Sequence, residues 1–413
     1  MNAISKSSFP AGNPAMLKAA RNLAALVVLV GLLTLQGCSK PREATGVMDT
    51  PDHHALRGND FLDAGNFAAA EKEFQLALSL DKKFSQAHAG MAVVEANRGN
   101  GQTSNITARK AAFNKADNHA GEALSNAKTK EDERAAHVAA MRARTITQVP
   151  ADDWLEDVED HYKQAVKTDP KEQDPNPAYF MARGYRDAFE FNKAISKYEM
   201  VIAMNRGRTQ EADKEMDIVQ KVVRSRPGTK YGKVVAFLPQ ISRADLASLF
   251  IGELKLANIY SRDPKFDTSF RTPDQADGGG AAKPTDISGH PLQADIEEVI
   301  KLGVSGLQPD ASGKFYPDKP ITRAEFAIMV EDILTKVTGE ANLKTKFIGG
   351  ESPFRDVRSD LPYFNAIQTV VSRNLMEPEN KVRGIFNPTG NLSGVDGLLV
   401  IRALNNELKS YTR

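Results

Sequence analysis

Apolar residues recur at helical spacing over most of this chain. From residue 51 onward they return every three or four positions, in segments separated by Gly, Asn or Pro. This period is typical of helices buried along one side, whereas a half-buried strand would alternate at every second residue. The pattern therefore predicts a mainly α protein, with helical segments in its first half at 51–84, 85–98, 104–128, 131–148, 154–170, 176–205 and 213–224.

Residues 1–37 break this pattern with one continuous apolar run. The run covers residues 23–35, and the segment before it holds Lys6, Lys18 and Arg21 but no acidic side chain. A positive head followed by an apolar run of this length is typical of a secretory signal, and the run is too short to span a bilayer comfortably. Residues 1–37 are therefore predicted to direct export.

The one cysteine of the chain lies just past this run. A small residue, Gly37, precedes Cys38, and this arrangement resembles the lipobox of bacterial lipoproteins. The resemblance implies that the Cys38 sulfur is lipidated, that the signal is cut before it, and that residues 38–50 form a lipidated tether at a membrane. Ser39 after the cysteine is similar to the outer-membrane sorting pattern of two-membrane bacteria. The alternative is an ordinary signal peptide with an incidental cysteine.

Small residues and phenylalanines alternate over 51–84 in the manner of two closely packed antiparallel helices. The positions are Gly58, Phe61, Gly65, Phe67, Ala70, Phe74 and Ala77. The small residues would let the helices approach, and the three rings would fill the space between them. This unit resembles a tetratricopeptide repeat of about 34 residues, although Lys82 stands where that repeat usually has proline. Weaker copies follow, so the resemblance implies an α-solenoid over 51–206 that binds a protein partner. We expect Trp154 to pack in its core.

A different unit occupies residues 286–336. An apolar helix is followed by a loop rich in Gly and Pro, and a second helix starts at Thr322. The sequence Gly313-Lys314-Phe315-Tyr316-Pro317, followed by Ile321-Thr322-Arg323-Ala324-Glu325-Phe326, closely resembles the S-layer homology repeat. A second copy spans 353–405, and a degenerate copy without most of the loop spans 207–261. The resemblance implies a pseudo-threefold α-helical module, and residues 262–285 look like a flexible insertion within it.

Each of the three motifs places a hydroxyl three residues before a carboxylate. This spacing is that of a capping box or its Asp variant, in which the two side chains satisfy the first N–H groups of a helix. Each cap is worth about 1 kcal/mol. The predicted helix-capping pairs are Thr322 with Glu325, Ser242 with Asp245, and Ser393 with Asp396.

Capping leaves Arg323 and Arg243 unexplained, because the start of a helix disfavours a cation. An anion held jointly by the guanidinium and the helix N-terminus would compensate. The alternative is an arginine in water or paired with an acid. The family resemblance implies a glycan-binding groove lined by these two arginines, with Asp286, Gly306 and Lys314 as further candidates. The third copy has Gly394 instead, so its groove would lack the arginine.

Composition and motifs argue against other classes of function. The formal net charge of +1 gives no indication of nucleic-acid binding. One cysteine excludes a disulfide framework and a cysteine-clustered metal site, and His53 and His54 lack a third ligand, so we expect no metal and no cofactor. No phosphate-binding loop, nucleophile elbow or zinc-protease motif occurs.

The sequence therefore predicts a non-catalytic cell-envelope lipoprotein. It would link a membrane, which we expect to be the outer one, to cell-wall polysaccharide or peptidoglycan, while the helical array binds a protein. One alternative is a scaffold for polysaccharide export or secretion, whose C-terminal module docks protein. Another is a glycan-active enzyme, because the two acids of a glycosidase need share no local signature.

Overall fold

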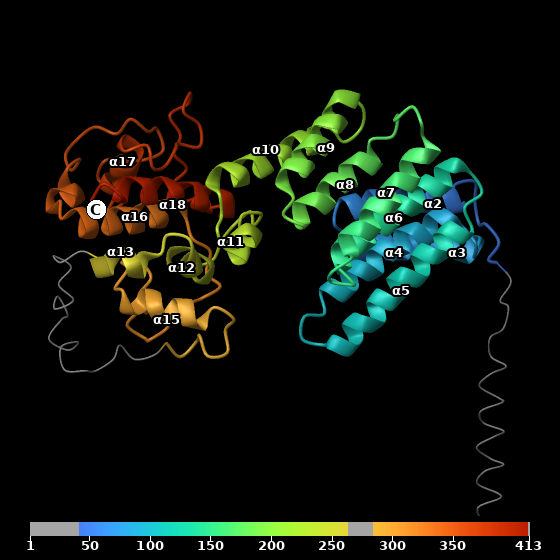
Figure 1. The fold of residues 1–413 in the computed structure, drawn as a ribbon, viewed down its shortest axis with the longest axis horizontal. Coiled ribbons are helices and arrows are strands. Elements are labelled where there is room, and N and C mark those ends of the chain that lie inside the picture. Colours follow the sequence, from blue (N-terminus) through green and yellow to red (C-terminus); the bar gives the residue numbers. More distant parts are fainter. Residues whose placement is uncertain (1–40, 263–283, 412–413) are drawn as a thin grey trace, which may run out of the picture. The chain divides into compact units, whose positions relative to one another are not determined.

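The computed structural model describes residues 41–262 and 284–411, which are mainly helical (Figure 1). The predicted signal at 1–37, the lipidation site Cys38 and most of the predicted insertion at 262–285 lie outside the described residues. The described part contains isolated β-bridges but no strand. The predicted mainly α fold class is therefore confirmed. The chain divides into two compact units, of which the first ends at Ala139 and the second begins at Ala140.

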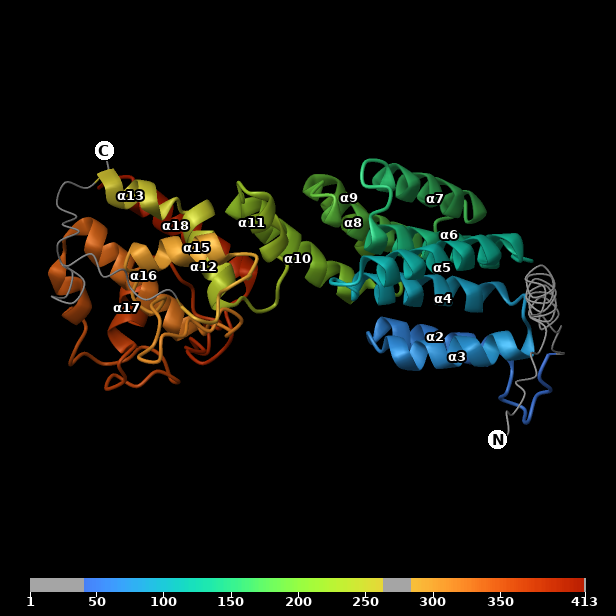
Figure 2. The ribbon, with the colours of Figure 1, turned by 90° about the horizontal axis from the view of Figure 1, so that it is seen from below.

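The first unit consists of helix pairs. Helix α2 (Pro51–Asp63) pairs with α3 (Phe67–Leu80), and α4 (Ser85–Asn100) pairs with α5 (Ile106–Ser125). Helix α3 also packs on α4, so that the two pairs stack (Figure 2). Helix α6 (Lys130–Thr147) begins in this unit. This stacking is consistent with the predicted helical solenoid.

Phe74 explains the small residues of the first pair. Its ring is fully buried between Gly58 and Gly90, where an added Cβ atom would lie 2.4 Å and 2.1 Å from ring carbons. Only glycine at both positions leaves room for the ring. The prediction that Phe67 fills the same space is wrong, since its side chain is 39% exposed. Phe67 is the first residue of α3 and lies at its end. Phe61 is partly exposed, with the Arg57 guanidinium carbon 6.0 Å from its ring centre.

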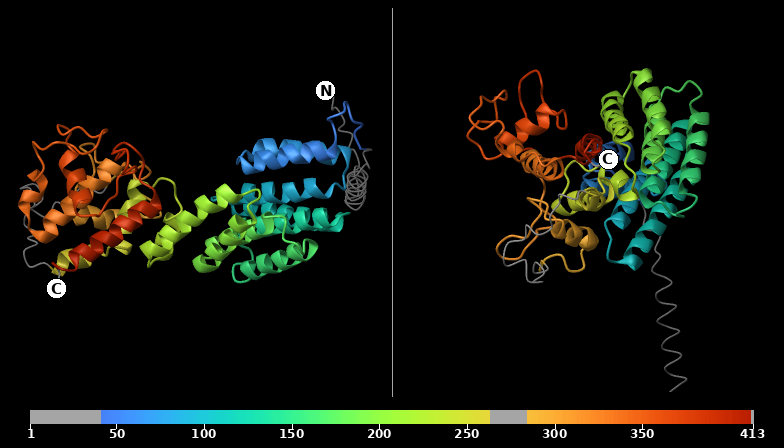
Figure 3. Two further views of the ribbon diagram at one scale, coloured as in Figure 1. Left: turned by 90° about the horizontal axis from the view of Figure 1, so that it is seen from above. Right: turned by 60° about the vertical axis from the view of Figure 1, so that its left-hand side comes forward.

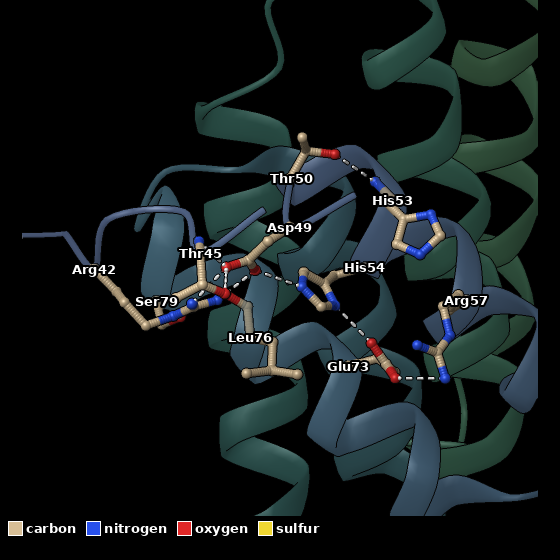
Figure 4. A network of polar contacts seen from close by, with 10 residues as sticks. All are labelled: Arg42, Thr45, Asp49, Thr50, His53, His54, Arg57, Glu73, Leu76 and Ser79. Atoms are coloured by element: carbon tan, nitrogen blue, oxygen red, sulfur yellow. Dashed lines mark hydrogen bonds and ion pairs between the residues drawn. The ribbon is translucent and has the colours of Figure 1, made fainter. Parts of the chain in front are cut away.

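The segment before α2 is folded against α3 (Figure 4). The backbone N–H of Arg42 donates to the Ser79 carbonyl at 2.7 Å, and its guanidinium binds both oxygens of Asp49 at 2.6 Å. The Arg42 guanidinium holds the pKa of the Asp49 carboxyl well below its usual range. His54 lies between Asp49 at 2.9 Å and Glu73 at 2.6 Å, so both of its ring nitrogens are engaged. The part of the predicted tether from Arg42 onward is thus a folded strap rather than an extended chain.

The second unit begins with further packed helices. Helix α7 (Trp154–Thr168) packs on α8 (Asn176–Asp187), α8 on α9 (Phe191–Met204), and α9 on α10 (Thr209–Ser225). Trp154 is 9% exposed, which confirms its predicted core position. Glu215 of α10 accepts hydrogen bonds from the Tyr179 hydroxyl of α8 at 2.8 Å and the Tyr198 hydroxyl of α9 at 2.6 Å. This carboxylate therefore ties three helices together.

The C-terminal part of this unit closes on itself (Figure 1 and Figure 3). Its elements are α11 (Lys230–Val235), α12 (Arg243–Gly252), α13 (Leu256–Arg262), α15 (Gln293–Lys301), α16 (Arg323–Thr338), the 3-10 helix η1 (Ala341–Thr345), α17 (Phe364–Ser372) and α18 (Gly394–Leu408). Helix α12 packs on α15, α16 on α17, and α18 on α10. The second helix of each predicted repeat thus packs on the first helix of the next, and the last returns to the first. One apolar core joins all three repeats.

Candidate functional site

The three repeat motifs meet at a ring of backbone hydrogen bonds. The N–H of Ile241 donates to the carbonyl of Leu392 at 3.0 Å, and the N–H of Leu392 donates to Ile321 at 2.9 Å. The N–H of Ile321 completes the ring by donating to Ile241 at 3.0 Å. Three equivalent residues, each just before a helix cap, therefore surround one pseudo-threefold axis. The starts of α12, α16 and α18 are consequently brought together.

The hydroxyl–carboxylate pairs lie at these helix starts. At α16 the Thr322 hydroxyl accepts the N–H of Glu325 at 3.2 Å, and the Glu325 carboxylate accepts the N–H of Thr322 at 2.8 Å. Ser242 and Asp245 make the same reciprocal bonds at α12, at 3.1 and 2.8 Å. At α18 the Ser393 hydroxyl accepts from the Asp396 N–H at 3.2 Å. The caps fix each helix start to its loop.

Arg323 is the first residue of α16, and its side chain folds onto the loop before α18. Its Nε–H donates to the Phe386 carbonyl at 2.9 Å and its Nη2 donates to the Glu377 carbonyl at 2.6 Å. The guanidinium carbon also lies 4.7 Å from the centre of the Phe386 ring. Carbonyl dipoles and an aromatic face thus compensate a cation at a helix N-terminus.

Arg243 at the start of α12 makes matching contacts with the loop before α16. Its Nε–H donates to the Phe315 carbonyl at 2.7 Å, its Nη2 donates to Gln308 at 3.1 Å, and its Nη1 donates to Gly306. The guanidinium carbon lies 4.6 Å from the Phe315 ring centre. Two of the three motifs therefore hold a neighbouring loop through an arginine.

Burial lowers the pKa of both arginines, although nearby carboxylates oppose the shift. Both stay cationic at neutral pH, because a guanidinium in a protein does not lose its proton. The two sites differ in one respect. All three nitrogens of Arg243 donate to carbonyls, whereas Nη1 of Arg323 makes no hydrogen bond to any residue within 41–262 or 284–411 and is in contact with solvent. Arg323 therefore keeps N–H groups for a ligand.

Asp286 shapes the loop that Arg243 holds. Its carboxylate accepts the N–H groups of Phe315 at 2.9 Å and Tyr316 at 2.7 Å. Asp356, which the sequence analysis did not single out as a site residue, accepts the N–H groups of Phe386 at 3.0 Å and Asn387 at 2.7 Å in the same way. The sequence spacing could have identified Asp356, because it precedes Phe386 by 30 residues and Asp286 precedes Phe315 by 29.

Gly306 and Lys314 lie on the same loop as Phe315. Gly306 has a φ angle of +82°, a backbone conformation in which any other side chain would be strained. The side chain of Lys314 is exposed. Tyr316 is 45% exposed and its hydroxyl donates to Asp310 at 3.0 Å. The outer surface of the loop thus presents a cation and an aromatic ring.

Gly394 takes the arginine position at α18 and lies against α11. An added Cβ atom would be 1.8 Å from the Val235 carbonyl oxygen. The N–H of Gly394 donates to the Leu238 carbonyl at 2.9 Å, as the N–H of Arg323 donates to Gly390 at 2.9 Å. The first repeat therefore replaces the long loop with α11, whose backbone occupies the space that an arginine side chain fills elsewhere.

Comparison with known proteins gives one family match. The model of the S-layer homology domain matches residues 285–327, the segment that holds Asp286, Phe315 and Arg323. No curated protein and no solved structure matches the chain. The predicted resemblance to S-layer homology domains is confirmed over this segment, which indicates a cell-envelope protein and cell-wall binding. No helix that the structure describes is long and apolar enough to cross a membrane.

Proposed function

We propose that this protein is a non-catalytic link between a membrane and the cell wall. In this proposal acylated Cys38 holds the outer membrane, the helix pairs of 51–206 bind a protein partner, and the C-terminal module binds cell-wall polysaccharide or peptidoglycan. The observation that carries the proposal is the S-layer homology match over residues 285–327. The lipid anchor and the protein partner rest on the sequence resemblances alone.

Arg323 is the centre of the proposed glycan site. Burial removes water from its guanidinium, and the carbonyls of Phe386 and Glu377 replace only part of that hydration. Its Nη1 points to no protein acceptor among the described residues. An anionic group of a glycan at Nη1 would complete the hydrogen bonding, and the N-terminus of α16 would add favourable charge. This explains why an acidic or charge-modified glycan would be preferred over a neutral one.

The loop at Arg243 would act differently. Because three of the five N–H groups of Arg243 already donate to carbonyls, we assign this residue the role of positioning the loop. The exposed Lys314 and Tyr316 would make the contacts, since an ammonium can pair with an anionic group and an aromatic ring can pack against a sugar. Asp286 would hold Tyr316 in place through its backbone N–H.

Co-sedimentation of the full chain with purified, protein-free cell wall tests the proposal. We expect the wild type to sediment with wall from its native source. The double variant Arg243→Ala, Arg323→Ala should remain in the supernatant. Arg206→Ala is the matched control, because Arg206 is an exposed arginine of the helical array. This control should sediment like the wild type.

Arg323 is buried and Arg243 is half-buried, and both hold backbone carbonyls, so their loss could unfold the module instead of removing a contact. The double variant Lys314→Ala, Tyr316→Ala avoids this difficulty, because both side chains are exposed. It should fold normally, as judged by circular dichroism, and bind wall more weakly. If the folded wild type fails to sediment with native wall, the glycan proposal is wrong and the module docks protein, as in the scaffold alternative.

A further inference from the structure

Two histidines from different helices of the first unit converge. The Nδ1 atoms of His88 on α4 and His119 on α5 lie 3.0 Å apart, and the ring centres are 5.2 Å apart at a tilt of 38°. The residues are separated by 31 positions in the chain, so no sequence motif brings them together. The close pairing of α4 and α5 does so. Both side chains are partly exposed and remain accessible from solvent.

The hydrogen bonding of His88 fixes which of its nitrogens is free to bind. Its Nε2 lies 2.9 Å from the carbonyl oxygen of Lys82. A carbonyl only accepts, so Nε2 carries the proton and the lone pair of the neutral ring is on Nδ1, which faces His119. Metal-binding histidines are held in the same way, by donating their other N–H to a carbonyl or carboxylate.

His119 can supply the second lone pair without losing a proton to solvent. Without a ligand its Nδ1–H donates to Nδ1 of His88. Movement of that proton to Nε2 of the same ring frees Nδ1 and keeps the ring neutral. Burial lowers the pKa of His119, and His88 lowers it further, which favours the neutral ring. Of the two charged neighbours, Glu122 opposes this shift and Lys115 adds to it.

We propose that His88 and His119 form a two-histidine site for Cu²⁺ or Ni²⁺ that joins α4 to α5. The 3.0 Å separation is that of the N–H···N hydrogen bond in the metal-free protein, so a small rotation of both rings would aim the two lone pairs at one metal. Cu²⁺ and Ni²⁺ suit imidazole ligands, and Cu²⁺ binds nitrogen ligands more tightly than the other divalent metals of its row. Among the residues described, no group of three or more His, Cys, Asp or Glu side chains could hold a metal. Water therefore completes the coordination, and the metal exchanges.

The site differs from the cell-wall and membrane contacts of the proposed function, and it does not depend on them. Because it joins two helices that are distant in sequence, a bound metal would stabilise the first unit by mass action. At a metal concentration about one hundred times the dissociation constant, the midpoint of thermal unfolding should rise by about 5 °C.

Thermal unfolding of the full chain, without a histidine tag and after removal of metals with EDTA, tests the site. Ni²⁺ should raise the midpoint of wild type, and neither His88→Gln nor His119→Gln should respond. His53→Gln is the matched control, because His53 is a partly exposed histidine of α2 in the same unit. This control should respond like the wild type. An equal shift in wild type and His119→Gln, or no shift in wild type, would overturn the proposal.

Copper spectroscopy on the wild type provides a test that does not depend on variants folding. Electron paramagnetic resonance of one equivalent of Cu²⁺ should show two coordinating imidazole nitrogens. A spectrum with one nitrogen would contradict the paired site.

Discussion

Arg323 and Gly394 occupy equivalent first positions of two helices, and the backbone opposite each helix decides which residue is allowed. Opposite Arg323, the loop before α18 offers the carbonyls of Glu377 and Phe386 at hydrogen-bond distance. Opposite Gly394, the Val235 carbonyl is too close for even one side-chain carbon. The same helix start therefore holds a loop in one repeat and packs directly on backbone in another.

Replacement of Gly394 by alanine should be strongly destabilising. The added Cβ would lie 1.8 Å from the Val235 oxygen, and backbone on both sides would have to move. We expect a loss of about 3 kcal/mol or more in the free energy of unfolding, measured by chemical denaturation. Gly397→Ala in the same helix is the control, because its Cβ would lie 3.4 Å from the nearest atom. That variant should be neutral or gain up to about 1 kcal/mol, since alanine favours helix interiors.

The phenylalanines of the first helix pair should differ sharply in how much their replacement by alanine lowers the free energy of unfolding. Phe74→Ala would leave a cavity between Gly58 and Gly90, and we expect it to cost about 3–5 kcal/mol of unfolding free energy. Phe67→Ala removes a ring that is 39% exposed, so it should cost less than about 1 kcal/mol. Denaturant unfolding of the two variants measures the difference. Equal losses would contradict the packing described for this pair.

At the scale of elements, the helices could be predicted from the sequence because their apolar period and their caps are local properties. The segment predicted at 104–128 forms α5, and Thr322 lies at the cap of α16. The exposure of Phe67 could not be predicted from the sequence, since the periodicity alone does not show where neighbouring helices stop covering a ring. The carbonyl partners of Arg323 lie 54 and 63 residues away, and only the closed packing of the repeats brings them to its side chain.

The cap of α16 should make stability depend on pH. Burial raises the pKa of Glu325, but the Thr322 N–H and hydroxyl and Lys319 outweigh it, so the folded pKa lies below the ordinary value of 4.5. A carboxyl with a lowered folded pKa contributes stability above pH 4.5, and this is lost as the pH falls through the folded pKa. Glu325→Gln should therefore lose about 0.5–1 kcal/mol at neutral pH, since the carboxylate is partly screened by solvent.

The measurement is the free energy of unfolding of wild type and Glu325→Gln as a function of pH. The difference between them should be constant above pH 4.5 and shrink at lower pH. Glu298→Gln on α15 serves as the control, because among the described residues the Glu298 carboxylate pairs only with the exposed Lys301, at 3.6 Å. A difference that grows on acidification would show that Glu325 is not held as an ionised cap.

At the scale of the whole molecule, the strap limits the free chain between the predicted lipid anchor and the folded array. Arg42 is bound to Ser79 and Asp49, so residues 39–41 alone would connect an acylated Cys38 to the first fixed residue. Three residues reach about 10 Å when extended. An anchored protein would thus hold the end of its first helix pair close to the membrane surface.

Membrane and wall attachment should therefore be separable by mutation. Cys38→Ser removes the predicted acylation site, so the protein should leave the membrane fraction yet still sediment with protein-free wall. Arg243→Ala, Arg323→Ala should do the reverse, and the triple variant should lose both attachments. The measurement is fractionation of cells that express each variant, with metabolic labelling by a radioactive fatty acid to detect acylation. Membrane retention of an unlabelled Cys38→Ser protein would show that something other than a lipid on this residue holds it there.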